Sequence, residues 1–321
     1  ASFAPSKMML IDSAETPQHD IRRMMAHDFP SVPCATVVTS ITKADRMENI
    51  FKTFLPEYVF HAAAYKHVPM MEDNPCESIQ NNVLGTKILA DLSVKYGVRR
   101  FVMVSTDKAV NPTNVMGCSK RICEVYVQSL NKAERDGVVK GQTQFITTRF
   151  GNVLGSNGSV IPIFERQIKA GGPVTDPNII RYFMLIPEAC ELVLEAGTKG
   201  EGGEIFVFDM GKPVRIADLA RRMIELSGAK GVEIKYTGLR DGEKLYEEVL
   251  SESEATKPSF HEKIRIACVR EYDWSDVSRE IDALIAQSHT YDDMAVMASM
   301  KRLVPEYISN HSKYTVLDHK A

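Results

Sequence analysis

Short apolar runs alternate with helical patterns through the first half of the chain, and this alternation restricts the fold more than any other feature of the sequence. The runs are rich in Val, Ile and Phe and lie at residues 7–12, 36–41, 58–62, 100–106 and 145–152. They are apolar on both faces, as the strands of a buried parallel sheet must be. Between the third and fourth runs, residues 75–96 carry one apolar stripe at helical spacing, formed by Leu84, Ile88, Leu89 and Leu92. We therefore predict an α/β fold with a doubly wound parallel sheet and right-handed crossovers.

The 321 residues suffice for one large α/β domain and a smaller lobe. After Asn152 the alternation gives way to a loop rich in Gly and Ser at residues 155–159. We predict that residues 1–151 form a Rossmann-like domain, to which residues 176–210 add a strand and a helix. Residues 152–175 and 211–305 are predicted to form the smaller α/β lobe, and residues 306–321 a loosely held tail.

The expected start of a dinucleotide-binding sheet is not found in the sequence. Such a sheet opens with a strand and a glycine-rich turn about 20 residues before the acid that binds the adenosine ribose. Asp12, at the end of the first apolar run, is the candidate acid, and only eleven residues precede it. We therefore expect the first strand and its glycine turn to lie upstream of residue 1. The alternative for Asp12 is to cap the following helix.

Composition excludes several classes of function. The formal charge of −3 provides no global field for a polyanion, so nucleic acid is not an expected partner. The six cysteines include no C-x-x-C pair, which favours reduced thiols over a disulfide framework or a zinc site, and no metal is expected. No apolar run is long enough to span a bilayer and no signal peptide opens the chain, so this portion is expected to be soluble.

The end of the fourth run carries the residues with the clearest chemistry. Thr106, Asp107 and Lys108 close the run, and a helix then presents Met116 and Lys120 one turn apart. Short-chain dehydrogenases place Tyr-x-x-x-Lys on this helix, where the ammonium lowers the pKa of the phenol so that it can accept a proton. A thioether cannot do this. Either the site is inactive, or its acid and base work has moved to neighbours such as Asp107 and Lys108.

Other candidate site residues follow the third run. The run leads into three small residues that would let a flat ligand approach the backbone, although packing alone is the alternative: Ala62, Ala63 and Ala64. Lys66 and His67 come next, at the carboxyl end of a strand, where ligands enter open α/β sheets. Asn82 lies inside the predicted helix, and its amide is expected to support the site through backbone or water.

The run from Ser105 to Lys120 resembles the extended short-chain dehydrogenase/reductase superfamily. Within it, the run is similar to the UDP-N-acetylglucosamine 4,6-dehydratases of the long, membrane-anchored type, which act in capsule, O-antigen and other polysaccharide biosynthesis and carry Met in place of Tyr. The likeness extends to residues 62–69, 82–86, 149–158, 181–189 and 238–248. The chain departs from the pattern in lacking the glycine fingerprint, in a segment 171–177 that is about two residues short, and in Asp241, where Pro is common.

The resemblance implies that residues 1–151 bind NAD, with NADP less expected, and that the enzyme is a lyase. NAD would take hydride from C4 of the sugar, water would leave across C5 and C6, and hydride would return to C6. Thr106 would polarise the C4 oxygen, Asp107 would act as the acid at O6, and Lys108 would be the base at C5 if its pKa is depressed. Lys120 would bind the nicotinamide ribose. Further expected cofactor contacts are Ser13, Ser40 and Ile41.

The resemblance also implies a UDP-sugar substrate. Asn152, Arg240 and Glu243 would hold the UDP portion, and arginine suits a diphosphate, although a solvated charge run is the alternative at residues 240–243. Other expected substrate contacts are Lys66, His67, Val160 and Arg181. The protein is expected at the cytoplasmic side of the inner membrane, anchored only by upstream helices, and a homo-oligomer remains open. Two rivals also remain: a UDP-sugar 4-epimerase and a catalytically silent NAD-binding scaffold.

Overall fold

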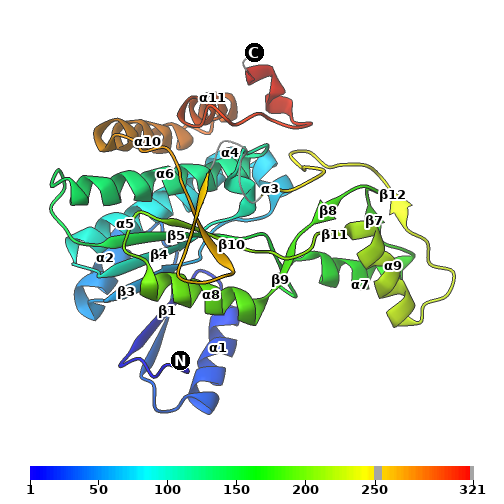
Figure 1. Cartoon of the computed structure of the whole chain (residues 1–321), viewed down its shortest axis with the longest axis horizontal. Helices are drawn as coiled ribbons and strands as arrows, with labels where there is room; N and C mark the ends of the chain where they lie inside the picture. Colours follow the sequence, from blue (N-terminus) through cyan, green and yellow to red (C-terminus); the bar gives the residue numbers. More distant parts are fainter. Residues whose placement is uncertain (249–254, 319–321) are drawn as a thin grey trace.

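The computed structural model describes residues 1–248 and 255–318, and its centre is a six-stranded sheet with the order β13-β14-β10-β5-β4-β3 (Figure 1). Its four parallel strands are β3 (Tyr58–His61), β4 (Arg100–Val104), β5 (Gln144–Arg149) and β10 (Ile205–Phe208). Two antiparallel strands complete it, β14 (Ile264–Ala267) and β13 (Thr256–Pro258). The predicted α/β fold with a mostly parallel sheet is confirmed.

The first two strands stand apart from this sheet. β1 (Met8–Asp12) and β2 (Cys34–Val38) pair in parallel as a separate two-stranded sheet, connected by α1 (Glu15–Asp28). α2 (Ala44–Phe54) follows β2 and contacts a later helix, α5 (Gly85–Lys95). β3 is consequently an edge strand. The prediction of one continuous sheet differs from this arrangement, because within the described residues no strand lies between β1 and β3 to join the two sheets.

Both faces of the central sheet are buried, as the apolar runs predicted. On β4, Phe101 and Met103 enter the larger core cluster, whereas Val102 between them enters a second cluster with α8 (Ile186–Lys199). The rings of Phe101 and Phe145, paired across β4 and β5, lie 5.3 Å apart. Alternate side chains therefore hold a helical layer on each face of the sheet.

The predicted helix at residues 75–96 consists of three consecutive segments: α4 (Pro75–Ser78), the π-helical η1 (Ile79–Leu84) and α5. It follows α3 (Val68–Asp73) and packs beside α6 (Val115–Arg135). The side chain of Asn114 begins α6, because its Oδ1 accepts a hydrogen bond from the Gly117 amide at 2.7 Å. Long and largely buried, α6 carries Met116 and Lys120 in its first turns.

The second lobe is built from short elements on the right of Figure 1. They are β6 (Asn152–Leu154), α7 (Val160–Ala170), β7 (Val174–Thr175), β8 (Ile180–Arg181), β9 (Phe183–Leu185), β11 (Val214–Arg215), α9 (Ile216–Ser227) and β12 (Lys235–Tyr236). A small core formed by Phe164, Ile179, Ile216 and Ala220 holds α7 and α9 together. None of the helices within residues 1–248 and 255–318 combines the length and apolarity needed to cross a bilayer.

The boundaries predicted for the second half of the chain differ from the structure. The prediction assigned residues 211–305 to the second lobe, but β13 and β14 extend the central sheet. α10 (Trp274–Ser288) packs on α6, and α11 (Asp293–Leu303) packs on α10, because Ile281, Leu284 and Met297 belong to the larger core. Residues 249–254 of the predicted lobe lie outside the described residues.

The segment after α11 is firmly packed, contrary to the predicted loose tail. Tyr307 and Tyr314 are buried in the larger core, and η3 (Lys313–Leu317) is the last helical element of the described chain. The Ser312 hydroxyl donates to the Glu72 carboxylate at 2.8 Å, and Lys301 pairs with Asp318. Residues 319–321 of the predicted tail lie outside the described residues.

Candidate active site

A cleft of about 710 Å³ lies where the carboxyl ends of β3, β4 and β5 meet the second lobe. This is the edge at which open α/β sheets bind their ligands. The cleft brings together most of the residues singled out in the sequence, which lie far apart along the chain. Those on its wall are Ala62, Ala64, Lys66, His67, Thr106, Lys108, Met116, Lys120, Asn152, Val160, Arg181, Arg240 and Glu243.

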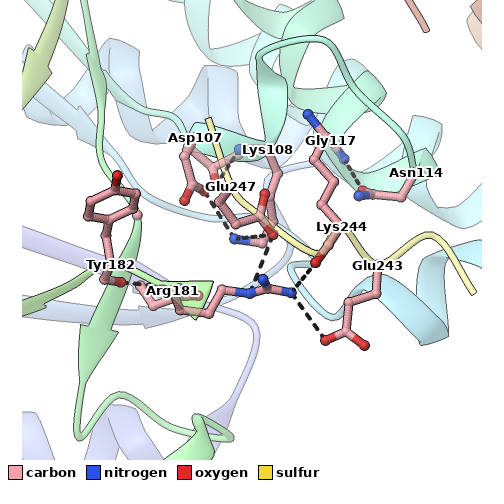
Figure 2. A network of polar contacts seen from close by, with 12 residues as sticks. Asp107, Lys108, Asn114, Gly117, Arg181, Tyr182, Glu243, Lys244 and Glu247 are labelled. Atoms are coloured by element: carbon pink, nitrogen blue, oxygen red, sulfur yellow. Dashed lines mark hydrogen bonds and ion pairs between the residues drawn. The ribbon is translucent and has the colours of Figure 1, made fainter. Parts of the chain in front are cut away.

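Asp107 lies immediately behind this wall. It begins the short η2 helix (Asp107–Ala109), is fully buried and is not among the residues that line the cleft. Its Oδ1 accepts a hydrogen bond from the Thr106 hydroxyl at 2.9 Å. The same oxygen accepts one from Lys108 Nζ at 3.0 Å (Figure 2), whereas Oδ2 has no hydrogen-bond partner among the described residues. Thr106 and Lys108 therefore separate the Asp107 carboxylate from a ligand in the cleft.

Lys108 is held by two carboxylates. Its Nζ lies 3.0 Å from Asp107 and 3.6 Å from Glu247, a residue of the second lobe (Figure 2). Burial alone would lower the pKa of Lys108, but Asp107 and Glu247 outweigh burial and the pKa is raised. The depressed pKa expected for a base at this position is therefore not found, because two anions stabilise the ammonium form.

Met116 and Lys120 both face the cleft from α6, as their spacing predicted. The Lys120 side chain is only 5% exposed, and its ammonium has no hydrogen bond or ion pair within the described part of the chain. Burial lowers its pKa, despite opposing contributions from Cys123 and Glu124. A buried cation that faces a cleft without an acceptor favours a ligand with hydroxyl or anionic oxygens at this point.

A buried ionic group fixes α6 to the ends of β4 and β5. Glu124, one turn beyond Lys120, accepts hydrogen bonds from Arg149 at 2.8 and 2.6 Å, from Ser105 at 2.7 Å and from Arg121 at 3.1 Å. Burial would raise the pKa of the Glu124 carboxyl, but Arg149 and its other partners lower it to about 2. Lys120 is consequently carried by a rigid helix.

The π-turn places Asn82 where it can tie three elements together. Its amide exchanges hydrogen bonds with the backbone of Tyr65, at 2.7 and 3.1 Å, and donates to the Ser119 hydroxyl of α6 at 3.0 Å. Asn82 therefore holds the loop that begins at Ala62, but it does not itself line the cleft, and neither does Ala63. π-Helical turns are frequent at functional sites, and this one buries the Asn82 amide with hydrogen-bond partners for both its oxygen and its nitrogen.

A charged cluster forms the wall on the side of the second lobe. Arg181 lies 3.3 Å from Glu243 and 3.6 Å from Glu247, and it donates to the carbonyl of Lys244 at 2.8 Å (Figure 2). Arg240 also pairs with Glu243, although its side chain is exposed. Across the cleft, the His67 ring lies so close to Gly158 that a Cβ there would be 2.7 Å from the ring. Asn152 donates to the carbonyl of Tyr182 at 3.2 Å.

The residues expected at the adenosine end lie away from this cleft. Asp12 ends β1, and its carboxylate accepts a hydrogen bond from the Ala14 amide at 2.8 Å, ahead of α1. Ser40 bonds with Thr42, and Ile41 packs over Gly85. Asp12, Ser13, Ser40 and Ile41 do not line the cleft, and their cofactor contacts stay a prediction.

Two functional features were missed in the sequence. Glu247 was not singled out, although it lies in the charged segment 238–248, and only the fold shows that it reaches Lys108. Asn114 donates to the Gly242 carbonyl at 3.1 Å and so joins α6 to the same segment. The sequence feature that could have pointed to Asn114 is its position just before a predicted helix. Within the described residues, no group of His, Cys, Asp or Glu could hold a metal ion.

A family model described as polysaccharide biosynthesis protein matches residues 1–269. The chain belongs to this polysaccharide biosynthesis protein family. Among curated relatives, the capsular polysaccharide biosynthesis protein CapD of Staphylococcus aureus is 46% identical over 89% of this chain, and the probable polysaccharide biosynthesis protein EpsC of Bacillus subtilis (strain 168) is 44% identical over 88%. The chain spans 47% of the length of each of these two proteins. A UDP-glucose 4-epimerase of Rickettsia typhi is 40% identical over 76% of this chain and 68% of its own length.

Solved structures share the architecture of this polysaccharide biosynthesis family member. Pen from Bacillus thuringiensis has a TM-score of 0.74 and 30% identity, covering 84% of this chain and 81% of that one. The dTDP-glucose 4,6-dehydratase DesIV from Streptomyces venezuelae, solved with NAD bound, has a TM-score of 0.59 and 20% identity over 74% of this chain and 86% of that one, which shows the fold alone. The resemblance to the extended short-chain dehydrogenase/reductase superfamily is confirmed. The UDP-N-acetylglucosamine 4,6-dehydratase type remains a prediction.

Proposed function

We propose that this chain is the catalytic part of an NAD-dependent 4,6-dehydratase that converts UDP-N-acetylglucosamine to a UDP-2-acetamido-2,6-dideoxy-4-keto-hexose. The observation that carries the proposal is the ion pair between Asp107 and Lys108, which lies directly behind Thr106 at the cleft, opposite a methionine in place of the phenol. The reaction needs an acid and a base besides hydride transfer, and this pair supplies both. The capsule protein among the relatives supports a role in polysaccharide precursor synthesis.

The residues at the nicotinamide end of the cleft fit NAD. Ala62 and Ala64 leave room for a flat ring, and the unpartnered ammonium of Lys120 suits a ribose hydroxyl. When bound, NAD supplies a hydride acceptor at C4 of the sugar and a hydride donor at C6. Bound NAD in DesIV, which has the same fold, supports this cofactor.

We assign Thr106 the role of a proton relay from the sugar to Asp107. Thr106 lines the cleft and its hydroxyl already donates to Asp107 Oδ1, so it can accept the C4 hydroxyl proton as it passes its own proton to the carboxylate. Asp107 would then be the acid that protonates the departing hydroxide at C6. A relay is required because the carboxylate does not itself face the cleft.

Protonation of Asp107 also prepares Lys108 for its role. The raised pKa of Lys108 depends on Asp107 and Glu247. When Asp107 takes up a proton, one of these anions is lost and the ammonium is stabilised less, so its pKa falls. Lys108 can then lose its ammonium proton to solvent water and, as the neutral amine, remove the C5 proton, which the C4 ketone has made acidic; it would return that proton to C5 when hydride adds to C6. The two residues thus act in order, as a coupled pair.

The charged cluster of the second lobe is the proposed site for the diphosphate of UDP. Arg181 and Arg240 supply guanidinium groups on the cleft wall, and Glu243 orients both. Lys66 and His67 lie across the cleft, where they would meet the sugar or the diphosphate. The family resemblance also supports an anchor at the cytoplasmic face of a membrane.

The rival with specific support is a UDP-sugar 4-epimerase, because a 40% identical relative carries that name. An epimerase would return hydride to C4 and would give Lys108 no evident task. In the deciding experiment, the protein is incubated with UDP-N-acetylglucosamine and NAD, and the molecular mass of the product is measured by mass spectrometry. A loss of about 18 mass units is expected, and an unchanged mass with inverted C4 would favour the epimerase. Binding of NAD and UDP without turnover would favour the silent scaffold.

Two substitutions test the assigned roles. We expect Asp107→Asn to lower turnover by about 10² to 10⁴ while nucleotide binding is kept, since this is the usual contribution of acid and base catalysis. Unchanged turnover would remove Asp107 from the mechanism. Met116→Tyr restores a phenol one turn before Lys120, and a large gain in turnover would show that the methionine is a defect. We expect no large gain, because Asp107 and Lys108 already perform the proton transfers.

A further inference from the structure

Glu247 is a carboxylate of the second lobe that reaches into the chemistry of the first. Residues 245–246 run beside β8, because the Ile180 amide donates to the Leu245 carbonyl at 3.1 Å and Ile180 and Tyr246 form an isolated β-bridge. This pairing places the side chain of Glu247, the next residue, on the cleft wall, where it is only 4% exposed. The position of Glu247 is thus set by backbone pairing with β8.

The contacts of Glu247 place it between two cations. Its Oε1 lies 3.6 Å from Lys108 Nζ and 3.6 Å from Arg181 Nε (Figure 2), and its Oε2 is buried without a hydrogen-bond partner in the part of the chain that the structure describes. Burying an ionised carboxylate costs several kcal/mol unless nearby cations offset it. The two cations that offset this cost are Lys108, which is assigned to proton transfer, and Arg181, which is assigned to the diphosphate.

The charges around Lys108 balance only when Glu247 is included. Asp107, Lys108, Glu247 and Arg181 carry two negative and two positive charges, so the group is neutral. Two further charged side chains of the same segment are paired with other groups: Glu243 with Arg181, and Lys244 with the exposed Glu248. Neutralising Glu247 would leave Lys108 with Asp107 as its one anionic contact within the described residues.

We propose that Glu247 is a positioning residue for proton transfer: it holds the Lys108 amine beside Asp107 and links it to Arg181, so that the second lobe controls when Lys108 can release its proton. This inference rests on the proposed function. A diphosphate that binds Arg181 would compete with Glu247 for that guanidinium, so that substrate binding and the state of Lys108 become linked. Because the charge of Arg181 lowers the pKa of Lys108, a diphosphate that neutralises Arg181 would make Lys108 hold its proton more tightly until Asp107 is protonated.

The test measures the titration of Lys108 directly, without turnover. The full chain is exposed to a trace of acetic anhydride at pH values from 6 to 11, and acetylation of the Lys108 peptide is followed by mass spectrometry. We expect Glu247→Gln to shift the onset of acetylation down by about 1 pH unit or more, the usual effect of losing an opposite charge at this range. Glu247→Asp should shift it less.

The matched control is Glu248→Gln, a neutralised carboxylate one residue away whose side chain is exposed and does not contact Lys108. Its acetylation profile should equal that of the parent protein. Equal profiles for Glu247→Gln and the parent would overturn the inference, as would an equal shift in Glu248→Gln. If Glu247→Gln fails to fold in a thermal melt, Glu247→Asp decides: a profile equal to the parent's overturns the inference, and a downward shift supports it.

The titration also separates this inference from the proposed function. If the parent protein fails to dehydrate UDP-N-acetylglucosamine, the proposed function is refuted. The acetylation profiles still test the role of Glu247, because they do not depend on turnover. If the parent protein does dehydrate it, the pH profile of kcat of the Glu247→Gln variant should be shifted down relative to that of the parent, as its acetylation profile is. Dehydration with an unshifted pH profile and an unshifted acetylation profile would remove Glu247 alone.

Discussion

The buried carboxylate of Glu124 allows the strongest quantitative prediction. Glu124 and Arg149 are both fully buried and are joined by two hydrogen bonds, and Ser105 and Arg121 complete the coordination of the carboxylate. The substitution Glu124→Gln keeps the shape of the side chain and removes its charge. We expect it to destabilise the fold, because the buried guanidinium groups of Arg149 and Arg121 then lose the carboxylate that they share.

The magnitude follows from the pKa. A pKa of about 2 in the folded protein, against 4.5 for an ordinary glutamate, is equivalent to about 3 kcal/mol of stability at neutral pH. Breaking a buried ion pair typically costs about 3 to 5 kcal/mol, which agrees. The folded pKa is depressed, so this stability is fully present above about pH 4.5 and is lost as the pH falls toward 2.

The assay is urea unfolding of the parent chain and of Glu124→Gln at several pH values. The difference in unfolding free energy should be about 3 kcal/mol between pH 5 and 8, and less than half of it should remain at pH 3. Glu306→Gln is the control, since Glu306 contacts the same Arg121 from a partly exposed site and should cost under about 1 kcal/mol. A difference below about 1 kcal/mol at pH 7, or one that is constant down to pH 3, would refute the reasoning.

Two further predictions concern groups beneath the site. Burial, with a smaller contribution from the charge of Lys120, lowers the pKa of His61 to about 3, so between about pH 6.5 and 3 only the unfolded chain binds this proton. Stability should therefore fall by about 1.4 kcal/mol for each unit by which the pH is lowered through that window. A urea titration of His61→Phe should lose this slope, and an unchanged slope would contradict the assignment. Ser312→Ala removes the hydroxyl donor to buried Glu72, whose other oxygen accepts the Val115 amide at the start of α6, and should cost about 1 to 3 kcal/mol in urea unfolding. Val316→Ala, at a 75% exposed side chain, is the control and should be neutral, and equal effects would exclude the proposed contact.

Much of the first domain could be predicted because local patterns specify it. The runs at residues 58–62, 100–106 and 145–152 became β3, β4 and β5, since a strand that is apolar on both faces is stable only inside a sheet covered on both sides. The spacing of Met116 and Lys120 correctly placed both on one face of a helix that meets the cleft. Such features need only a few neighbouring residues to be recognised.

Tertiary structure decided the rest, because it depends on contacts between distant residues. No local pattern indicates that α10 covers α6, or that a hydrogen bond between Ser312 and Glu72 holds the last described residues against the core. It also could not show that Lys108, adjacent to Asp107 in the chain, would meet Glu247 from the other lobe and so have its pKa raised. The sequence by itself determined which groups could exchange protons; the fold determined which charges surround them, and electrostatic energy depends on those distances.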